Sequence, residues 1–304
     1  IRRLVVDPGS AFFFQTRPMS RRALSEAAKR ATFLPQHIPR PAYSQTGVVP
    51  PPLPWAIVHT DEVILRLRHA AKVARKMLDL SLLLAEPGIS TDEIDVQVHD
   101  AIAREGAYPA PLNYAGFPKS VCSSVNAVVC HGIPDAYVLQ AGDIVSFDVS
   151  VFYGGVYGDN CGTVIVKGGP EDARGRLLVD VTQKAMDAAI TTVYPGGCLT
   201  SVGTAISDLA DEHKFGVVER YCGHGIGEMF HLPPLVQHTR NRAKFELLPG
   251  HVFTIEPMLT EGRPEVTVLE DDWTVVTNDG SRAAQFEHMV LVTTDGYEVL
   301  TVLD

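Results

Sequence analysis

Five side chains that can bind metal are spread over the second half of this 304-residue chain. They are four carboxylates and one imidazole: Asp148, Asp159, His224, Glu256 and Glu287. Several stand in apolar stretches, where a carboxylate is costly to bury unless it shares a cation or stays protonated. Four carboxylates and one neutral imidazole together carry a charge of −4, which two divalent ions would balance. The set therefore predicts a two-metal hydrolytic site.

Taken singly, each of these residues has a simpler interpretation. An Asp after a Gly is usually a turn residue, a Glu in a strand usually faces water, and Gly-His-Gly is more often a loop than a metal site. The five together on apolar strands favour metal binding. Oxygen and imidazole ligands without thiolate suit Mn, Co, Fe or Zn, and the sequence does not choose among them.

The hydrophobic periodicity predicts the elements that position these residues. Apolar side chains from Thr60 onward follow helical spacing until Pro87-Gly88 stops the helix. Ser90-Thr91-Asp92-Glu93 is a capping-box signature for a second helix, which closes at Gly106.

The same order of elements returns in the second half. A helix is predicted over about 171–194, Pro195-Gly196 stops it, Thr200-Ser201 begins another, and Gly216 ends that. The interval along the chain from Pro87 to Asp148 equals the interval from Pro195 to Glu256. This equal spacing predicts two equivalent halves, one supplying the Asp pair and the other the Glu pair, with the site between them.

Strand patterns predict how the metal-binding side chains face one another. Residues 144–151 alternate, so that Asp148 lies on the polar face, and 153–155 can turn the chain into a strand over 156–166. Asp159 should then lie opposite or diagonal to Asp148. Glu256 ends a strand, Glu287 lies within a strand over 285–293, and the glycines beside His224 let backbone pass close to a bound group.

Composition sets limits on the class of protein. Apolar content of 45% and charged content of 20% are ordinary for a globular enzyme, and no apolar run approaches the roughly 18–20 residues that span a bilayer. A net charge of −10 argues against nucleic-acid binding by the body of the protein, so neither DNA nor membrane is expected as a partner. Five cysteines without CxxC spacing indicate reduced thiols in a cytosol-like compartment.

The amino-terminal segment, residues 1–54, differs from the rest of the chain. Residues 1–41 carry eight Lys/Arg against two Asp/Glu, a balance of +6 that leaves −16 on the remainder. Prolines cluster in residues 35–54, which predicts an extended strap and excludes helix or central strand. We therefore expect a basic, Pro-rich arm over 1–54 and a catalytic domain over 55–304. The Arg-rich start is either a solvated arm on the acidic body or the remnant of a transit peptide.

Several separate motifs, in order, resemble type I methionine aminopeptidases over about residues 58–304. They are Tyr114-Ala115-Gly116-Phe117-Pro118-Lys119-Ser120-Val121-Cys122, Val129-Cys130-His131-Gly132-Ile133-Pro134-Asp135, Gly223-His224-Gly225-Ile226-Gly227 with Phe230-His231, Thr254-Ile255-Glu256-Pro257-Met258 and Gln285-Phe286-Glu287-His288. The segment His37-Ile38-Pro39-Arg40-Pro41 resembles the one that precedes the catalytic domain in eukaryotic members. The stretch between His224 and Glu256 is too short to hold the helical insert of type II enzymes.

The resemblance implies an α+β pita-bread fold, with pseudo-two-fold halves around a central antiparallel sheet. It also implies removal of the initiator methionine from nascent chains, with preference for a small second residue. The five residues named first match the family's metal ligands, so two divalent ions per chain are expected. His131 and His231 match the histidines that contact the scissile amide, and Glu256 would accept the proton of the attacking water. The pocket for the methionine side chain would use Tyr114, Phe117, Cys122, Phe230 and Trp273, whose aromatic edges and thiol suit a thioether.

Two departures from the family pattern and several alternatives remain. Ala115 stands where some members carry His, and Asn160-Cys161 follows Asp159 where a Thr or a Leu-Asn pair is common. A prolidase or Xaa-Pro aminopeptidase would use the same ligand types but usually carries a larger amino-terminal domain. A non-enzymatic adaptor should have lost ligands, and the basic arm could contact the ribosome. We expect a monomer in the cytoplasm, or in an organelle if the arm is a transit remnant.

Overall fold

The computed structural model describes residues 27–28, 30–31 and 34–303. Residues 27–28 and 30–31 are helical. The helices are α2 (Asp61–Leu84), α3 (Thr91–Arg104), α4 (Ala173–Ile190), α5 (Thr200–His213) and the short 3₁₀ helix η1 (Tyr114–Gly116). The strands of the first half are β1 (Tyr108–Pro109), β2 (Cys122–Val125), β3 (Val128–Cys130), β4 (Ile144–Tyr153) and β5 (Val156–Ile165). Those of the second half are β6 (Gly216–Val217), β7 (Gly223–Gly225), β8 (Leu232–Val236), β9 (Val252–Ile255), β10 (Met258–Thr260), β11 (Val266–Val268), β12 (Val275–Thr277), β13 (Ala283–Gln285), β14 (His288–Val292) and β15 (Tyr297–Val299).

The helix boundaries confirm the predicted repeat of a long and a shorter helix. The Thr60 side chain caps α2 by accepting from the backbone of Val63. Ser90 and Glu93 form the predicted capping box of α3, in which each side chain bonds the other residue's backbone N–H. The pair α4 and α5 repeats this layout in the second half, so each half contributes two helices.

Antiparallel strands place the two halves side by side. The hairpin of β4 and β5 pairs ten residues with ten, and β2 pairs with β4 on its other edge. The second half forms a sheet in the order β15-β14-β9-β7-β8. Backbone hydrogen bonds between Cys161 on β5 and Glu287 join the two parts. The site predicted between the halves therefore lies where β5 meets the β13–β14 segment.

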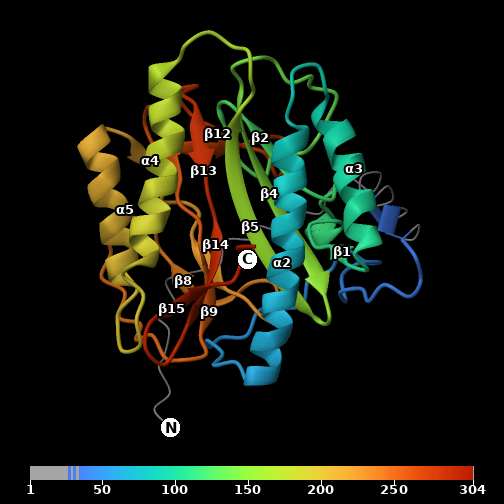
Figure 1. Cartoon of the computed structure of the whole chain (residues 1–304), viewed down its shortest axis with the longest axis vertical. Coiled ribbons are helices and arrows are strands. Elements are labelled where there is room, and N and C mark those ends of the chain that lie inside the picture. Colours follow the sequence, from blue (N-terminus) through green and yellow to red (C-terminus); the bar gives the residue numbers. More distant parts are fainter. Residues whose placement is uncertain (1–26, 29, 32–33, 304) are drawn as a thin grey trace.

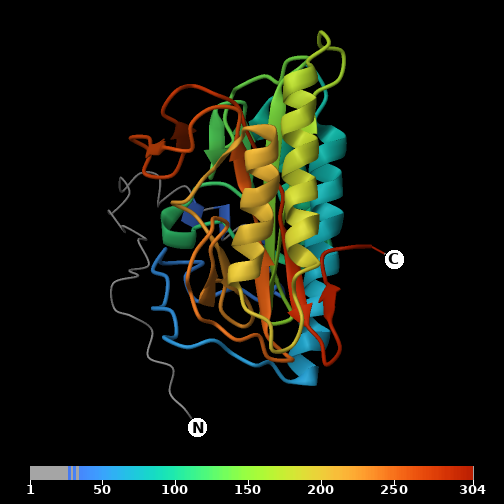
Figure 2. The same ribbon diagram turned by 90° about the vertical axis from the view of Figure 1, so that its left-hand side faces the viewer.

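Helices α2 and α4 lie on the same side of the long strands (Figures 1 and 2). Helix α2 packs directly on β5, and this contact explains Gly158. A Cβ at Gly158 would stand 2.3 Å from the Ala70 carbonyl oxygen, so a larger residue would push the helix off the strand. Because α2 is held this closely, the neighbouring Asp159 is directed to the opposite face of β5.

The Pro-rich strap (residues 35–54) runs on the side of the strands away from the helices (Figure 2). It has turns and extended backbone, as predicted. Ile38 and Tyr43 are each 2% exposed and belong to the same hydrophobic cluster as Tyr108 and Leu112 of the body. The Tyr43 hydroxyl donates to the Ala110 carbonyl at 2.6 Å. The described part of the arm is thus anchored to the core at these positions, while most of its prolines stay exposed.

The proposed boundary between arm and catalytic domain at residue 54 stays a prediction. The basic start of the chain, residues 1–26, lies outside the described residues. Within the described part, no helix is both long enough and apolar enough to cross a bilayer.

Candidate metal centre

Three of the five predicted ligands come together most tightly. Asp159 projects from β5, His224 lies at the middle of β7, and Glu287 stands between β13 and β14. One ligand atom from each lies within 4.8 Å of the other two, and all three residues are buried. Positions far apart in the sequence therefore meet at one point, as the two-half model predicts.

The other two predicted ligands lie beside this group. Glu256 follows β9 directly, and its Oε1 is 3.7 Å from Nε2 of His224, while Oδ2 of Asp159 is 3.6 Å from the same nitrogen. On the β4–β5 hairpin, Asp159 pairs with Ser150 and Asp148 pairs with Cys161, so the two aspartates are diagonal neighbours. Asp148 is the most exposed of the five. We call the whole set the five-residue cluster.

Burial and mutual repulsion disfavour the ionised form of three of these carboxyl groups. Desolvation raises the pKa of Asp148, Glu256 and Glu287 well above their ordinary values, and the negative charge of Asp159 raises each further. Asp159 Oδ1 is itself buried without a hydrogen-bond partner in the described structure. A buried, unpaired carboxylate oxygen facing other carboxylates is unfavourable unless a cation satisfies it. The residues present thus fit a divalent-cation site.

The imidazole of His224 is oriented as a metal ligand would be. Its Nδ1 lies 3.2 Å from the Gly225 carbonyl, which can only accept, so Nδ1 carries the proton. In the neutral ring Nε2 then presents its lone pair to Asp159 and Glu256. The flanking glycines serve close strand packing: a Cβ at Gly223 would meet the Thr254 oxygen at 2.2 Å. This differs from the expected role of admitting a bound group.

Glu256 is positioned by residues that the sequence did not single out. The Thr254 hydroxyl donates to its Oε1 at 3.0 Å, and Gln285 Nε2 lies 3.4 Å from its Oε2. The backbone N–H of Glu256 donates to Nε2 of His238, a histidine only 2% exposed. Burial lowers the pKa of His238 to about 3, which keeps it neutral and able to accept. The sequence offered little indication of Thr254, Gln285 and His238, because each belongs to a strand or loop whose local sequence is typical of a protein core.

In the absence of metal, Glu287→Gln is expected to stabilise the protein at pH 8. The raised pKa of Glu287 means that the folded state resists its ionisation, so this group contributes stability below about pH 4.5 that is lost as pH rises through its folded pKa. Each unit of difference between folded and unfolded pKa is worth about 1.4 kcal/mol. Urea unfolding in chelator should show a gain of at least this size at pH 8, shrinking toward pH 4.5. An equal gain at both pH values would contradict this cause.

Aromatic rings stack around the buried imidazoles. Phe230 and His231 stack with centroids 4.3 Å apart, and His231 lies 4.3 Å from the His224 ring. Tyr114 packs edge-on against Phe230 at 5.3 Å, and its hydroxyl is 2.8 Å from Nδ1 of His231. A substrate bound at the five-residue cluster would therefore contact these aromatic rings directly.

Two further residues predicted for the pocket, Phe117 and Trp273, form a second aromatic group beside His131. Phe117 contacts Trp273 edge-on at 5.0 Å, and Trp273 lies 6.1 Å from the ring of His131. Cys122 on β2 pairs in register with Asp148 on β4. We call Tyr114, Phe117, Cys122, Phe230 and Trp273 the aromatic pocket. His131 has a backbone φ of +55°, in the left-handed region, and burial lowers its pKa to about 4.

The strap lines an open pocket of about 300 Å³ that also includes His231. Its lining is mostly apolar and includes Tyr43, Pro51, Tyr114 and Ala115. Because Ala115 has a small side chain, it leaves room here that a His would fill.

The second departure, Asn160-Cys161, is accommodated by backbone pairing. Asn160 Nδ2 donates to the Val149 carbonyl at 2.8 Å, across the hairpin. Cys161 exchanges two backbone hydrogen bonds with Glu287, so this position fixes the distance between the halves. This bridge also interrupts the strand predicted over 285–293, which the structure divides into β13 and β14 around Glu287.

Comparisons with known proteins agree with this geometry. A family model described as metallopeptidase family M24 matches residues 66–294. Methionine aminopeptidase 1D, chloroplastic/mitochondrial, of Arabidopsis thaliana is 44% identical over 268 residues, covering 88% of this chain and 76% of that protein. Methionine aminopeptidase 1D, mitochondrial, of Homo sapiens is 44% identical over 280 residues, covering 92% and 83%.

Solved structures give the same picture for the fold. The crystal structure of methionine aminopeptidase from Rickettsia prowazekii aligns with a TM-score of 0.79 at 41% identity, covering 82% of this chain and all of that one. Prolidase from Pyrococcus furiosus aligns with a TM-score of 0.66 at 20% identity, covering 82% and 66%, which shows a shared fold alone. The predicted α+β pita-bread fold is confirmed.

Proposed function

The chain belongs to metallopeptidase family M24, and from this premise we propose that it removes the initiator methionine from nascent proteins. It is a metallo-aminopeptidase that hydrolyses the first peptide bond of its substrate. The observation that carries the proposal is the place of His231 between the five-residue cluster and the aromatic pocket: its ring centroid lies 4.3 Å from that of His224 and 4.3 Å from that of Phe230. A thioether side chain held in the aromatic pocket would place the carbonyl of the substrate near the acidic side chains.

We assign Asp148, Asp159, His224, Glu256 and Glu287 as the residues that hold divalent metal. Two ions per chain fit the charge of −4 on this set, with Mn, Co, Fe or Zn as candidates. When bound, they supply Lewis-acid polarisation of the substrate carbonyl and activation of water. A preference for a small residue after the methionine remains part of the proposal.

The protein's own residues then divide the work. Glu256, fixed by Thr254 and Gln285, accepts a proton from the attacking water. Burial and the neighbouring imidazoles lower the pKa of His231 well below its ordinary value, so its ring is neutral. In the tautomer in which the Tyr114 hydroxyl donates to Nδ1, Nε2 of His231 carries the proton and can donate to charge that develops on the amide oxygen. We assign His131, whose lowered pKa also keeps it neutral, as the second donor.

The aromatic pocket supplies the preference for methionine. Phe230 and Trp273 offer ring faces and edges that contact sulfur favourably. Burial raises the pKa of the Cys122 thiol well above its ordinary value, so this residue stays neutral. A neutral, apolar pocket favours an unbranched thioether over a charged or strongly polar side chain.

Metal removal tests the reaction and the cofactor together. Activity on Met-Ala-Ser should vanish in chelator and return as Mn, Co, Fe or Zn is added stepwise, reaching its plateau at two equivalents per chain. The protein without added metal and with Mg alone serves as control. Full activity in the continued presence of a strong chelator would refute the metal-dependent mechanism, and a plateau at one equivalent would refute the two-ion assignment.

A prolidase-like specificity is the competing activity of the same fold. The similarity at 41% identity to a methionine aminopeptidase, against 20% to a prolidase, favours the first. Met-Ala-Ser should be cleaved, and a peptide with proline in second position and an amino-terminal residue other than methionine should not. Preferential cleavage of the second peptide would reverse the assignment.

The location and partners of the protein are part of the proposal. Both sequence relatives above carry organellar names, one chloroplastic/mitochondrial and one mitochondrial. The cytoplasmic location expected from the sequence is not confirmed, and we propose an organellar one. The substrates would then be proteins made or imported there. Ribosome contact through the basic arm and the monomeric state stay predictions, and salt-sensitive ribosome pelleting that is lost when residues 1–41 are deleted would support the first.

A further inference from the structure

A buried carboxylate outside the metal centre bonds the segment that carries the aromatic pocket. Asp95, on α3, is fully buried. Its Oδ1 accepts the backbone N–H groups of Ser120 at 2.7 Å and Val121 at 3.2 Å. These two residues lie between Phe117 and Cys122, both of the aromatic pocket, and Cys122 begins β2. The carboxylate therefore sets where this stretch of backbone lies.

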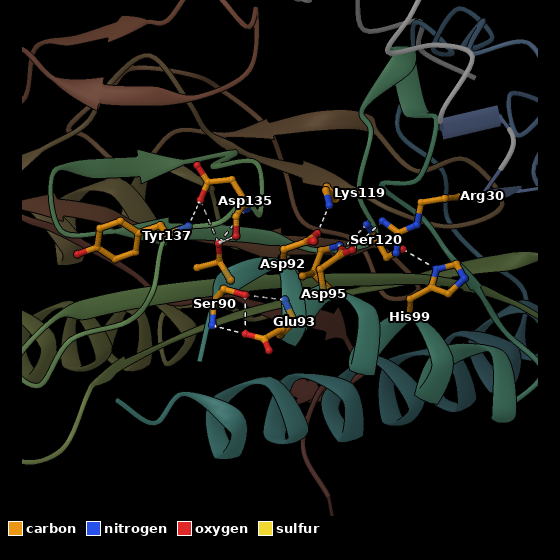
Figure 3. A network of polar contacts seen from close by, with 12 residues as sticks. Arg30, Ser90, Asp92, Glu93, Asp95, His99, Lys119, Ser120, Asp135 and Tyr137 are labelled. Carbon is orange, nitrogen blue, oxygen red and sulfur yellow. Dashed lines mark hydrogen bonds and ion pairs between the residues drawn. The ribbon is translucent and has the colours of Figure 1, made fainter. Parts of the chain in front are cut away.

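Two neighbours on the same helical face strengthen this hold (Figure 3). His99, four residues after Asp95, lies 2.7 Å from the Ser120 hydroxyl through its Nδ1. Asp92, three residues before Asp95, forms an ion pair with Lys119. Spacing of three and four residues places all of them on one side of α3. Helix α3 thus holds residues 119–121 at three successive positions.

The second oxygen of Asp95 is paired from the amino-terminal segment. Arg30 Nη1 donates to Oδ2 at 2.7 Å, and the Arg30 side chain is only 26% exposed. The segment is itself docked, because Ala27 and Ala31 are fully buried in the hydrophobic cluster that includes Tyr114 and Phe230. A buried carboxylate that loses its cationic partner is unfavourable and must move, take up water or become protonated. Each response loosens the bonds to Ser120 and Val121.

We propose that Asp95 is a positioning residue for the aromatic pocket and that Arg30 completes it, so that docking of the amino-terminal segment sets the enzyme's selectivity for methionine. This rests on the function proposed above. The segment before the catalytic domain is then part of the specificity apparatus, although none of its residues needs to touch the substrate.

Arg30→Gln tests this by changing selectivity rather than activity alone. The ratio of kcat/KM for Met-Ala-Ser over Leu-Ala-Ser should fall about tenfold, since a displaced pocket wall discriminates poorly between similar side chains. The change should appear mainly in KM for Met-Ala-Ser. Arg30→Lys keeps the charge without the planar fork and should give an intermediate ratio. Arg176→Gln is the matched control: it removes an exposed ion pair between Arg176 on α4 and Glu171 before that helix, and it should leave the ratio unchanged.

Amide hydrogen exchange provides a readout that needs neither metal nor substrate. The Ser120 and Val121 amides should exchange faster in Arg30→Gln than in the wild type, and Arg176→Gln should not alter them. A selectivity ratio within about threefold of the wild type together with unchanged exchange would overturn the proposal. If Arg30→Gln does not fold, the same two readouts on Arg30→Lys decide it. If the wild type fails to cleave Met-Ala-Ser, the proposed function falls, and exchange alone decides the positioning role.

Discussion

Replacing Glu256 by Gln is expected to lower kcat on Met-Ala-Ser by about 10³-fold, within the range of lost general-base catalysis. The amide keeps the size of the side chain and can still receive the Thr254 hydroxyl, which now donates to Oε1 of Glu256 at 3.0 Å. The substitution removes the group that can accept a proton, and it also removes one negative charge beside His224. The effect should therefore fall on kcat more than on KM.

Metal content separates the two roles of Glu256. Calorimetric titration with Mn should show weaker binding in Glu256→Gln, because one anionic ligand of the cluster has become neutral. Saturating Mn should restore full metal occupancy of Glu256→Gln, but its kcat should stay low. Glu246 is exposed, and the matched control variant Glu246→Gln should leave both the affinity for Mn and kcat unchanged. A Glu256→Gln enzyme that retains kcat within about tenfold at saturating metal would remove this residue as the base.

The sequence predicted the elements well where local chemistry decides them. The capping box of Ser90 and Glu93 and the Pro-Gly stops after each long helix depend on residues a few positions apart, so their signal survives without tertiary information. The diagonal placement of Asp148 and Asp159 followed from the alternation of one hairpin. Local sequence alone could not predict that β5 contacts the segment around Glu287; that prediction also required the repeat of the two halves.

The unpredicted parts of the site depend on contacts between distant segments. His238 accepts from the Glu256 backbone 18 residues away, and nothing in its local sequence distinguishes it from a core histidine. Asp95 on the face of α3 is similar: its partners Arg30 and Ser120 lie 65 and 25 residues away. A buried carboxylate inside an amphipathic helix was the available signal, since Asp is rarely buried without partners.

The described part of the basic arm shows what charge counting leaves out. Its excess of Lys/Arg left a solvated arm and a transit remnant as alternatives, and most of those charges lie outside the described residues. Within the described part, Arg30 pairs with the buried Asp95 and Ala31 is fully buried. Net charge reports on long-range attraction and solubility, whereas docking depends on the apolar residues between the charges. Among the described residues up to 34, the buried ones are Ala27, Ala31 and Leu34, the last only 3% exposed.

His231→Ala is the second change expected to have a large effect. Removing one preorganised donor to a developing oxyanion costs about 10²–10³ in kcat, and His231 is held for that purpose by Tyr114 on one side and by the stacked ring of Phe230 on the other. Its lowered pKa keeps the ring neutral through the physiological range, so the loss should be the same at pH 6.5 and pH 8. Steady-state kinetics on Met-Ala-Ser at both pH values measures it.

Two further variants distinguish the donor role from packing. Tyr114→Phe preserves the aromatic wall but removes the hydroxyl at 2.8 Å from Nδ1, so the His231 ring loses the bond that fixes its tautomer. Its kcat should fall by a smaller factor, about tenfold, with KM little changed. His69→Ala, on the exposed face of α2, is the control and should match the wild type. If His231→Ala kept kcat within about threefold while remaining folded and metal-loaded, the charge developing on the amide oxygen would have to be stabilised without it, leaving His131 as the donor from this chain.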